Sequence, residues 1–482
     1  MKMSDLKEIS SKKIDNESES RHSKITFLSF GMYQLTWTIV GSANGLFLFF
    51  YYHTIAGLDP LLIFTATAIL TFWYAFNDPI IGFLTDRNFK WTRKWGRRFP
   101  FILLGGIPWC FSIVLIYSAP EVTVSPWPTF FWFLGVNAIY EALITLTDVN
   151  VGSLRVDKFR TEKERRKYSS YFAPLDMLAL VIGMVVPPLL LGLAAGAASY
   201  TVMALLVGLI GLVFFLLFIP GAREDKVIID RYYSGEYESM NFRKGIIKIL
   251  KEKSFVSFWI HYATFMVATT ILTAMVVYLT TFVLQTSSDM MTVLLAIFLT
   301  GTLISVPIWL KVLKKVNNNK KVYLIGSSLL CITLIPLSFF QGLIDLAIFM
   351  FIVGLAMGCI WTLGIPVMLS SVMDQFVVNT GKNQKGFLMG AWGLLSVFTA
   401  FLDELIMSLI FSITGFEAGL ETYSELVASG ANVELVIWGI RLLVGVIPMI
   451  VVVVGTIIFW KIYPLTQEKI LENKMKLKEL GF

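Results

Sequence analysis

The sequence has few charged residues, cysteines and histidines for its length. Only 15% of its 482 residues are charged, whereas 56% are hydrophobic, which is not the composition of a water-soluble protein. Its three cysteines lie inside apolar runs and its three histidines are far apart, which argues against a disulfide framework, a thiolate metal cluster or a metalloenzyme. We therefore expect a membrane protein that is not an enzyme, holds no cofactor and binds no nucleic acid.

Apolar runs of helical length fill most of the chain. They lie near residues 27–53, 61–85, 99–119, 128–154, 168–195 and 198–220 and, after a polar break, near 254–284, 290–313, 322–340, 344–372, 386–413 and 432–462. At about 20 apolar residues per membrane-spanning helix, they predict an all-α polytopic protein with twelve transmembrane helices. The expected parts are a tail at 1–25, a six-helix half at 26–220, a central loop at 221–253, a six-helix half at 254–463 and a tail at 464–482.

The basic residues predict the orientation in the membrane. Of the 40 lysines and arginines, all except Arg441 fall in the termini or in alternate loops, and the intervening loops hold only acids such as Asp59 and Glu121. The positive-inside rule then places both termini in the cytoplasm, which requires an even number of spans. We expect an integral protein of the plasma (inner) membrane. Arg441, inside the last helix, is expected either to form an interior ion pair or to reach toward the outer surface.

The loop after the second predicted helix carries the most specific motif. Its sequence is N-D-P-I-I-G-F-L-T-D-R at 77–87, followed by W-G-R-R-F-P at 95–100. This resembles the glycoside-pentoside-hexuronide:cation symporters, the family of the melibiose permease, whose second helix ends in N-D-P-x-x-G before a W-G-K/R-R-x-P loop. The resemblance implies the major facilitator fold, in which two pseudo-symmetric halves rock about a central site.

Charged residues of the same loop are candidates for a gate between the halves. Asp86 and Arg87 follow the second helix, and Arg97 and Arg98 precede the third. We expect Asp86 to pair with basic residues across the interface of the halves, and Gly82 to allow close helix approach. The alternative is that these charges are solvated topology signals.

Polar residues form stripes on two of the apolar helices. An acid at membrane depth is costly unless it is paired or faces a polar cavity, so each one is a candidate for function. The acids in question are Asp78, Glu141, Asp148, Asp176, Asp403 and Glu404. Glu141, Thr145 and Asp148 recur at helical spacing and share one face of the fourth helix. Asp78 lies at about the same depth as Asp148, so the two could share one cation.

The resemblance extends to a cation site. In the melibiose permease family this site is formed by two acids one turn apart on the second helix with the intervening Asn, plus Thr and Asp on the fourth. Asn77, Asp78, Thr145 and Asp148 match, whereas Tyr74 occupies the position of the first acid. The oxygen atoms suit sodium, and a single carboxylate suffices for a proton. We expect one of these ions to be coupled, with a purely structural polar network as the alternative.

The sugar-binding residues of that family are less well matched. The first helix has no acid, Gly152 stands where the permease has a stacking Trp, and the eleventh-helix Lys position falls at Ser396 or Val397. The remaining candidates for binding a solute are Gln34, Thr38, Asn44, Glu141 and Trp361. The favoured function is therefore cation-coupled symport of a glycoside or sugar-type small molecule by a monomer in contact with membrane lipids. The alternative is transport of a lysophospholipid or another amphipathic solute, with proton coupling or none.

Overall fold

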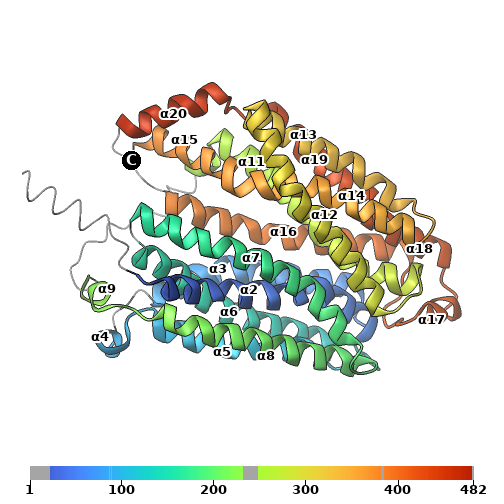
Figure 1. The fold of residues 1–482 in the computed structure, drawn as a ribbon. Helices are drawn as coiled ribbons and strands as arrows, with labels where there is room; N and C mark the ends of the chain where they lie inside the picture. The colour runs from blue at the N-terminus through green and yellow to red at the C-terminus, as the bar shows by residue number, and fades with distance from the viewer. Residues whose placement is uncertain are drawn as a thin grey trace, which may run out of the picture. The chain divides into compact units, whose positions relative to one another are not determined.

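The computed structural model describes residues 22–85, 87, 89–159, 161–231, 248–381 and 385–479. Every regular element in these ranges is a helix (Figure 1). This follows from the composition, because a helix satisfies all of its backbone hydrogen bonds internally and can therefore lie in hydrocarbon. The all-α prediction is confirmed.

The described part of the chain up to residue 222 contains six long helices. They are α2 (Lys24–Phe50), α3 (Pro60–Thr85), α5 (Phe99–Ile116), α6 (Trp127–Lys158), α7 (Glu162–Leu191) and α8 (Ala197–Ala222), with short α4 (Thr92–Trp95) and α9 (Lys226–Arg231) beside them. The later part contains α11 (Lys253–Tyr278), α12 (Ser288–Val316), α13 (Asn319–Leu334), α14 (Leu343–Leu363), α15 (Ser370–Thr380), α16 (Lys385–Thr414), α17 (Tyr423–Ala428), α18 (Val433–Val444), α19 (Val446–Ile462) and α20 (Gln467–Glu479).

Within the described residues, 11 helices are long and apolar enough to cross a membrane. The remaining expected span is α2, which at 27 residues is long enough but carries Gln34, Thr38 and Asn44 among its apolar side chains. Several spans are composite: α14 continues through η4 (Gly364–Leu369) into α15, and α18 and α19 meet at Gly445. The twelve-helix architecture expected from the sequence is therefore present.

Helix ends differ from the sequence-based expectation where charged residues continue a helix beyond the apolar run. The fourth helix reaches Lys158 and the fifth begins at Glu162, where the hydroxyl of Thr161 accepts a hydrogen bond from the Glu164 amide. The C-terminal segment, which was expected only as a tail, contains α20. Apolar runs mark membrane depth, whereas caps decide where a helix ends.

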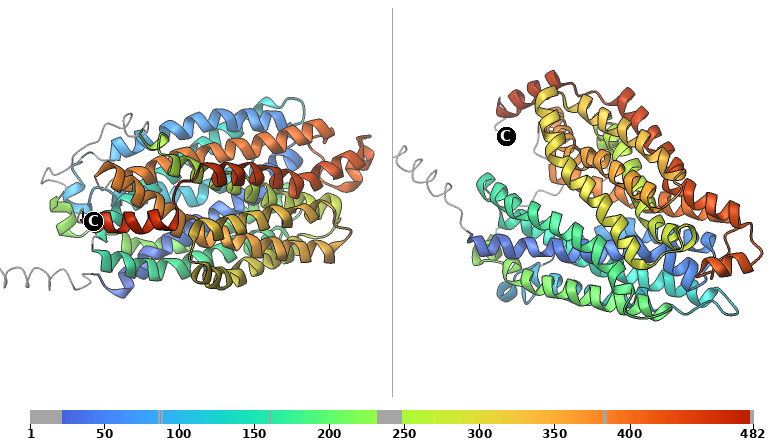
Figure 2. Two further views of the ribbon diagram at one scale, coloured as in Figure 1. Left: turned by 90° about the horizontal axis from the view of Figure 1, so that it is seen from above. Right: turned by 45° about the vertical axis from the view of Figure 1, so that its right-hand side comes forward.

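The chain divides into two compact units. Unit 1 consists of Met1–Asn44, Trp73–Ser118 and Gly135–Tyr237, and unit 2 consists of Gly45–Phe72, Ala119–Leu134 and Glu238–Phe482. Within unit 2, helices α12, α13, α14 and α19 run alongside one another in both views of Figure 2. The division into halves at the 221–253 loop stays a prediction.

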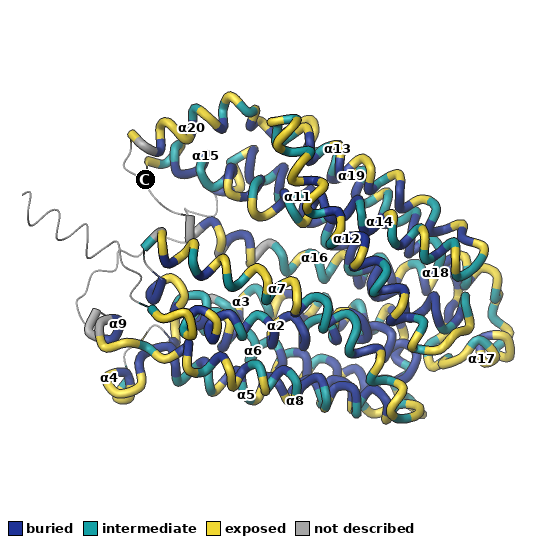
Figure 3. Tube along the Cα trace, in the orientation of Figure 1, coloured by how far each residue is buried: buried dark blue, intermediate teal, exposed yellow. Residues whose placement is uncertain are grey.

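Helix α11 is the core helix of unit 2. Of its most apolar stretch, 78% is buried, against 28–50% for the other ten spans. The other long helices show buried and exposed positions in alternation along their length (Figure 3). Close contact also occurs where α12 crosses α14, because a Cβ at Gly301 or Gly354 would collide with the backbone of the other helix.

The first helix of each set of six ends in the same irregular turn. The π-helical turns η1 (Tyr51–Ile55) and η2 (Leu279–Val283) follow α2 and α11. The paired backbone hydrogen bonds are Ala56 N to Tyr51 O and Leu58 N to Tyr52 O in one, and Leu284 N to Leu279 O and Thr286 N to Thr280 O in the other, all 2.8 Å. Gly57 and Gln285 occupy the matching left-handed position, with φ of +75° and +52°.

Candidate functional site

Polar side chains of α3 and α6 contact the opposite helix inside unit 1. The hydroxyl of Thr145 donates to Oδ1 of Asp78 at 2.9 Å. The side-chain amide of Asn77 donates to the backbone carbonyl of Glu141 at 3.5 Å. Asn77 and Thr145 are buried, whereas Asp78 and Glu141 are half-buried. The sequence predicted a polar face on the fourth helix and a shared depth for Asp78 and Asp148, and the shared cation site stays a prediction.

A third helix joins this cluster through Asp148. The hydroxyl of Tyr33, which is buried on α2, donates to Oδ1 of Asp148 at 3.1 Å. Asp148 itself is exposed, so an ion could reach its carboxylate. A carboxylate oxygen with a free side, next to hydroxyl and amide groups, is a ligand that sodium accepts after losing water.

The three acids of this region influence one another. Glu141 interacts electrostatically with Asp78 and Asp148, and Arg155 acts on Asp148. Three acids at membrane depth with one nearby guanidinium are unfavourable. Binding of a small cation, or of a proton to one carboxylate, would relieve the repulsion.

A second polar group lies between α2 and α7. Gln34 donates through its side-chain amide to Oδ1 of Asp176 at 2.7 Å and to the Thr38 hydroxyl at 3.1 Å. Thr38 is buried, and Gln34 and Asp176 are half-buried. The structure thus gives Asp176, whose role the sequence left open, a place beside two candidate solute-binding residues.

The remaining candidate residues are Asn44, Tyr74 and Trp361. Asn44, at the end of unit 1, has a buried side-chain carbonyl oxygen without a hydrogen-bond partner among the described atoms. Tyr74 is half-buried on α3. Trp361 belongs to unit 2, where its ring packs edge to face on Phe265 with centroids 5.7 Å apart. Their roles stay predictions.

At the beginning of α5, the carboxylate of Glu224 holds the W-G-R-R segment. It accepts the backbone N–H groups of Arg97 at 3.2 Å, Arg98 at 2.6 Å and Phe99 at 2.9 Å. The Arg98 side chain is buried between Asn150 on α6, at 3.4 Å, and Asp157, at 3.9 Å. A carboxylate at a helix N-terminus satisfies unpaired amides and the helix dipole together.

The other two gate candidates are Asp86 and Arg87. Asp86 lies outside the described residues. Arg87 is exposed, with its guanidinium 4.6 Å from the centroid of the Phe83 ring. The gate therefore stays a prediction. The expectation for Gly82 is wrong, because a Cβ there would meet Val149 at an ordinary 4.0 Å, so close helix approach does not depend on this glycine.

The side chains of Arg441 and His261 form hydrogen bonds within unit 2. The Arg441 guanidinium donates to the Phe340 carbonyl at 2.7 Å and to the Ser338 carbonyl at 3.5 Å, at the end of the η3 turn (Ile335–Ser338), and forms no ion pair with a described acid. Of the two expected roles, the interior ion pair is therefore wrong. His261 Nδ1 hydrogen-bonds the Tyr323 hydroxyl at 3.0 Å. Among the described residues, no group of three His, Cys, Asp or Glu side chains is placed to hold a metal.

Sequence reasoning did not single out Tyr33 or Glu224, and it named Asp176 as a candidate without identifying Gln34 as its partner. Tyr33 could have been flagged, because a tyrosine hydroxyl inside an apolar helix needs a partner. Asp176 and Gln34 are separated by 142 residues, and Glu224 and Arg98 by 126. No local spacing predicts contacts at such separations.

Comparisons with known proteins agree with this architecture. A model of the MFS/sugar transport protein family matches residues 29–467. The sodium-dependent lysophosphatidylcholine symporter 1 of Gallus gallus is 23% identical, with 96% of this chain and 91% of the relative covered. The sphingosine-1-phosphate transporter MFSD2B of Xenopus tropicalis is 21% identical, with 95% and 92% covered.

The fold also matches a solved transporter. The crystal structure of a bacterial homologue of the human lysosomal transporter Spinster aligns with a TM-score of 0.67 at 14% identity, covering 94% of this chain and 99% of that one. At this identity the likeness shows the fold alone. Since the family model spans most of the chain, and the apolar helices are those of an integral membrane protein, the chain belongs to the MFS/sugar transport protein family.

Proposed function

We propose that the protein is a cation-coupled transporter that carries a lysophospholipid, or another solute with a polar head and an apolar chain, by alternating access. The observation that carries the proposal is the acidic cluster of Asp78 and Asp148, in which the Thr145 hydroxyl donates to Asp78 at 2.9 Å and the Tyr33 hydroxyl donates to Asp148 at 3.1 Å. Carboxylate and hydroxyl oxygens are the ligands that a small cation accepts after losing water. Coupling follows if solute binding and cation binding stabilise the same state.

The cargo is proposed from the relatives together with what the chain lacks. Relatives that share over nine-tenths of their length with this chain are named for lysophosphatidylcholine and sphingosine-1-phosphate, each of which has one polar head and one apolar chain. The first helix has no acid for sugar hydroxyls, Gly152 stands where the resemblance implies a stacking Trp, and the implied Lys position falls at Ser396 or Val397. The amphipathic alternative is therefore better supported than the glycoside that the loop motif alone favoured.

The residues take separate roles in this proposal. Asn77, Asp78, Thr145 and Asp148 supply oxygen ligands for the cation, with Tyr74 beside them and Tyr33 orienting Asp148. Gln34, Thr38, Asn44, Glu141 and Trp361 are the candidates for the solute. Asp86, Arg87, Arg97 and Arg98 form the proposed gate. Sodium is the proposed ion, because the Gallus gallus relative is named as sodium-dependent, and a proton is the alternative.

We further propose that the protein is a monomer in the plasma (inner) membrane with both termini in the cytoplasm. The basis is the distribution of lysine and arginine between alternate loops. The central loop carries basic and apolar residues at helical period, which suits contact with anionic lipid of the inner leaflet.

Uptake into proteoliposomes tests the function. The purified protein is given labelled lysophosphatidylcholine, or a panel of glycosides, under an imposed sodium gradient or an imposed proton gradient. We expect lysophosphatidylcholine uptake that the sodium gradient accelerates. Glycoside accumulation without lysolipid uptake would restore the sugar function, and uptake of neither class would refute both. Lysolipid uptake that follows only the proton gradient would change the ion and keep the cargo.

A further inference from the structure

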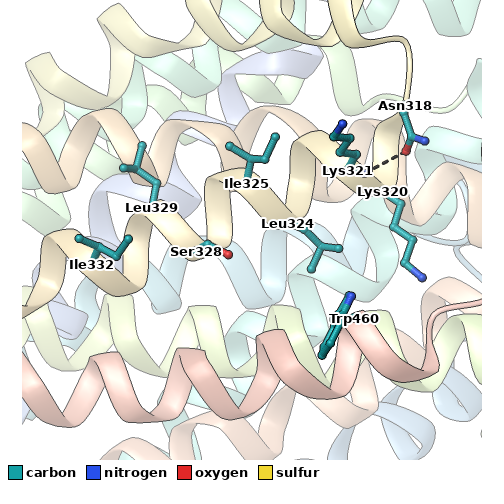
Figure 4. Close-up of a pocket in the computed structure, with 9 residues that line it drawn as sticks. All are labelled: Asn318, Lys320, Lys321, Leu324, Ile325, Ser328, Leu329, Ile332 and Trp460. Atoms are coloured by element: carbon teal, nitrogen blue, oxygen red, sulfur yellow. Dashed lines mark hydrogen bonds between the residues drawn. The ribbon is translucent and has the colours of Figure 1, made fainter.

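A groove runs along the surface of unit 2 between α13 and α19. Its volume is about 590 Å³. The side chains that line it are Asn318, Lys320, Lys321, Leu324, Ile325, Ser328, Leu329, Ile332 and Trp460. Figure 4 shows Asn318, Lys320 and Lys321 gathered at one end of the groove, Ile332 at the other, and Leu324 facing the Trp460 ring.

The length of the groove is close to the thickness of the hydrocarbon layer of one leaflet. Lys321, Ile325, Ser328 and Ile332 repeat at helical spacing and form one stripe of α13. At about 1.5 Å per residue this stripe is about 16 Å long. Half of a hydrocarbon core is about 15 Å thick. The apolar part is also open, since Ile325 is 44% and Ile332 64% exposed. A fatty acyl chain alongside α13 would cover these side chains.

The polar end of the groove carries positive charge that the described acids do not neutralise. Lys320 Nζ donates to the Tyr463 carbonyl oxygen at 2.6 Å and lies 5.9 Å from the Tyr463 ring centroid. This contact positions the ammonium group and leaves it two further donors. Lys321 is exposed, and neither lysine forms an ion pair with an acid in the described ranges.

The same end contains further groups suited to a headgroup. The side chain of Asn318 caps α13 by accepting the Lys321 amide at 2.9 Å (Figure 4). Its amide nitrogen can still donate. Trp460, 60% exposed near the end of α19, is the kind of residue that lies at the headgroup level of a bilayer. Lysines, amide donors and tryptophan above an apolar stripe together match a phosphate-bearing lipid.

We propose that this groove binds one acidic glycerophospholipid, with its phosphate-bearing headgroup on Lys320 and Lys321 and an acyl chain along Leu324, Ile325, Leu329 and Ile332. The site is distinct from the proposed transport site, because none of its lining residues belongs to the acidic cluster or to the candidate solute-binding residues. Its occupant is a resident of the membrane rather than the cargo. Charge complementarity selects an acidic lipid over phosphatidylcholine, whose headgroup has no net charge.

Lipid retention measured by native mass spectrometry tests the site. The full-length protein is reconstituted in phosphatidylcholine with one-fifth phosphatidylglycerol and extracted in mild detergent. The wild type is expected to retain one phosphatidylglycerol per chain. In the double variant Lys320→Gln/Lys321→Gln, the association constant for phosphatidylglycerol should fall about 30-fold. This corresponds to about 1 kcal/mol for each lysine near an anionic lipid, at about 1.4 kcal/mol per tenfold.

Matched variants separate a site from a general surface charge. Lys314→Gln/Lys315→Gln removes the same charge from the exposed end of α12, outside the groove, and should retain the lipid like the wild type. Lys320→Arg/Lys321→Arg should also retain it. Leu329→Trp, which fills the groove and keeps both lysines, should lose it. The proposal is overturned if Lys320→Gln/Lys321→Gln retains phosphatidylglycerol like the wild type, if the α12 variant loses as much, or if phosphatidylcholine or lysophosphatidylcholine is retained equally well.

Discussion

Glu224 is a residue whose importance lies in the backbone it holds. Its carboxylate accepts three amides at the beginning of α5, and hydrogen bonds to a charged acceptor contribute more than neutral ones. We expect Glu224→Ala to lower the free energy of unfolding by about 1–3 kcal/mol. Equilibrium unfolding in mixed micelles measures this. Asp225→Ala, at a neighbouring side chain that is 54% exposed, is the control and should change little. Equal stability of the two variants would contradict the role of Glu224.

Gly96 is required by the same arrangement. Its φ of +90° is a conformation that residues with a side chain rarely adopt, and a Cβ there would lie 2.5 Å from the Glu224 carboxyl carbon. Gly96→Ala should therefore destabilise the protein by about 1–3 kcal/mol, measured in the same unfolding assay. Gly135→Ala, in the interior of α6 with no atom within 4 Å of the added Cβ, should be neutral or slightly stabilising. A neutral Gly96→Ala would show that the turn is adaptable.

The acidic cluster is expected to couple solute uptake to the cation gradient. Asp78→Asn and Asp148→Asn keep the size of each side chain but remove a charge, so each should reduce gradient-driven uptake by more than about tenfold, a loss of about 1.4 kcal/mol or more in cation binding. Exchange of solute without a gradient should partly survive. Asp289→Asn, at an exposed acid at the beginning of α12, is the control. Full concentrative uptake by both cluster variants would remove the proposed cation site.

At the scale of elements, α20 is attached to the rest of unit 2 by a chain of hydrogen bonds that begins at a buried amide. Asn473 donates to Gln375 on α15 at 2.9 Å, Gln375 donates to Asn379 at 2.7 Å, and Asn379 donates to Glu252 at 2.9 Å. Asn473 is 1% exposed. An amphipathic helix of 13 residues is marginal alone, so its order depends on this attachment and on apolar contacts such as that of Ile470.

Removing the attachment should release α20. Asn473→Ala leaves the Gln375 carbonyl oxygen without its donor, at a cost of about 1–3 kcal/mol. Amide hydrogen exchange in 467–479 should become about tenfold faster, because about 1.4 kcal/mol corresponds to a factor of ten. Met475→Ala, at a side chain that is 60% exposed, should leave the exchange unchanged. Equal exchange in Asn473→Ala and the wild type would mean that apolar contacts alone hold the helix.

The elements also show how far the sequence could predict the structure. Apolar runs predicted the spans, and helical spacing predicted that Glu141, Thr145 and Asp148 share one face of the fourth helix, but it did not predict the contact of Thr145 with Asp78. The partner of Asp148 could not be predicted, because Tyr33 is 115 residues away and its contact depends on how α2 packs on α6. The extent of α6 and the presence of α20 were missed because helices with charged residues outside the hydrocarbon have no apolar run to mark them.

At the scale of the whole molecule, the distribution of lysine and arginine predicts that both chain termini lie in the cytoplasm. Single cysteines introduced as Ser23→Cys and Lys474→Cys, in a variant without the native cysteines, should resist a membrane-impermeant thiol reagent added outside intact cells. Glu417→Cys, in a loop on the opposite side, should be labelled. All three positions are exposed, so protection would come from the membrane. Labelling of one terminus alone from outside would contradict an even number of spans, and labelling of both would contradict the proposed orientation.

The turns after α2 and α11 share a backbone geometry, although their amino acids differ. Residues 51–58 and 279–286 have no identical residue at equivalent places, yet they share both long hydrogen bonds and a left-handed residue at Gly57 and Gln285. Internal repeats of transporters are often detectable only as weak symmetry. The backbone of these two turns is therefore more alike than their amino acids, which is what an internal repeat of the two sets of six helices would leave behind.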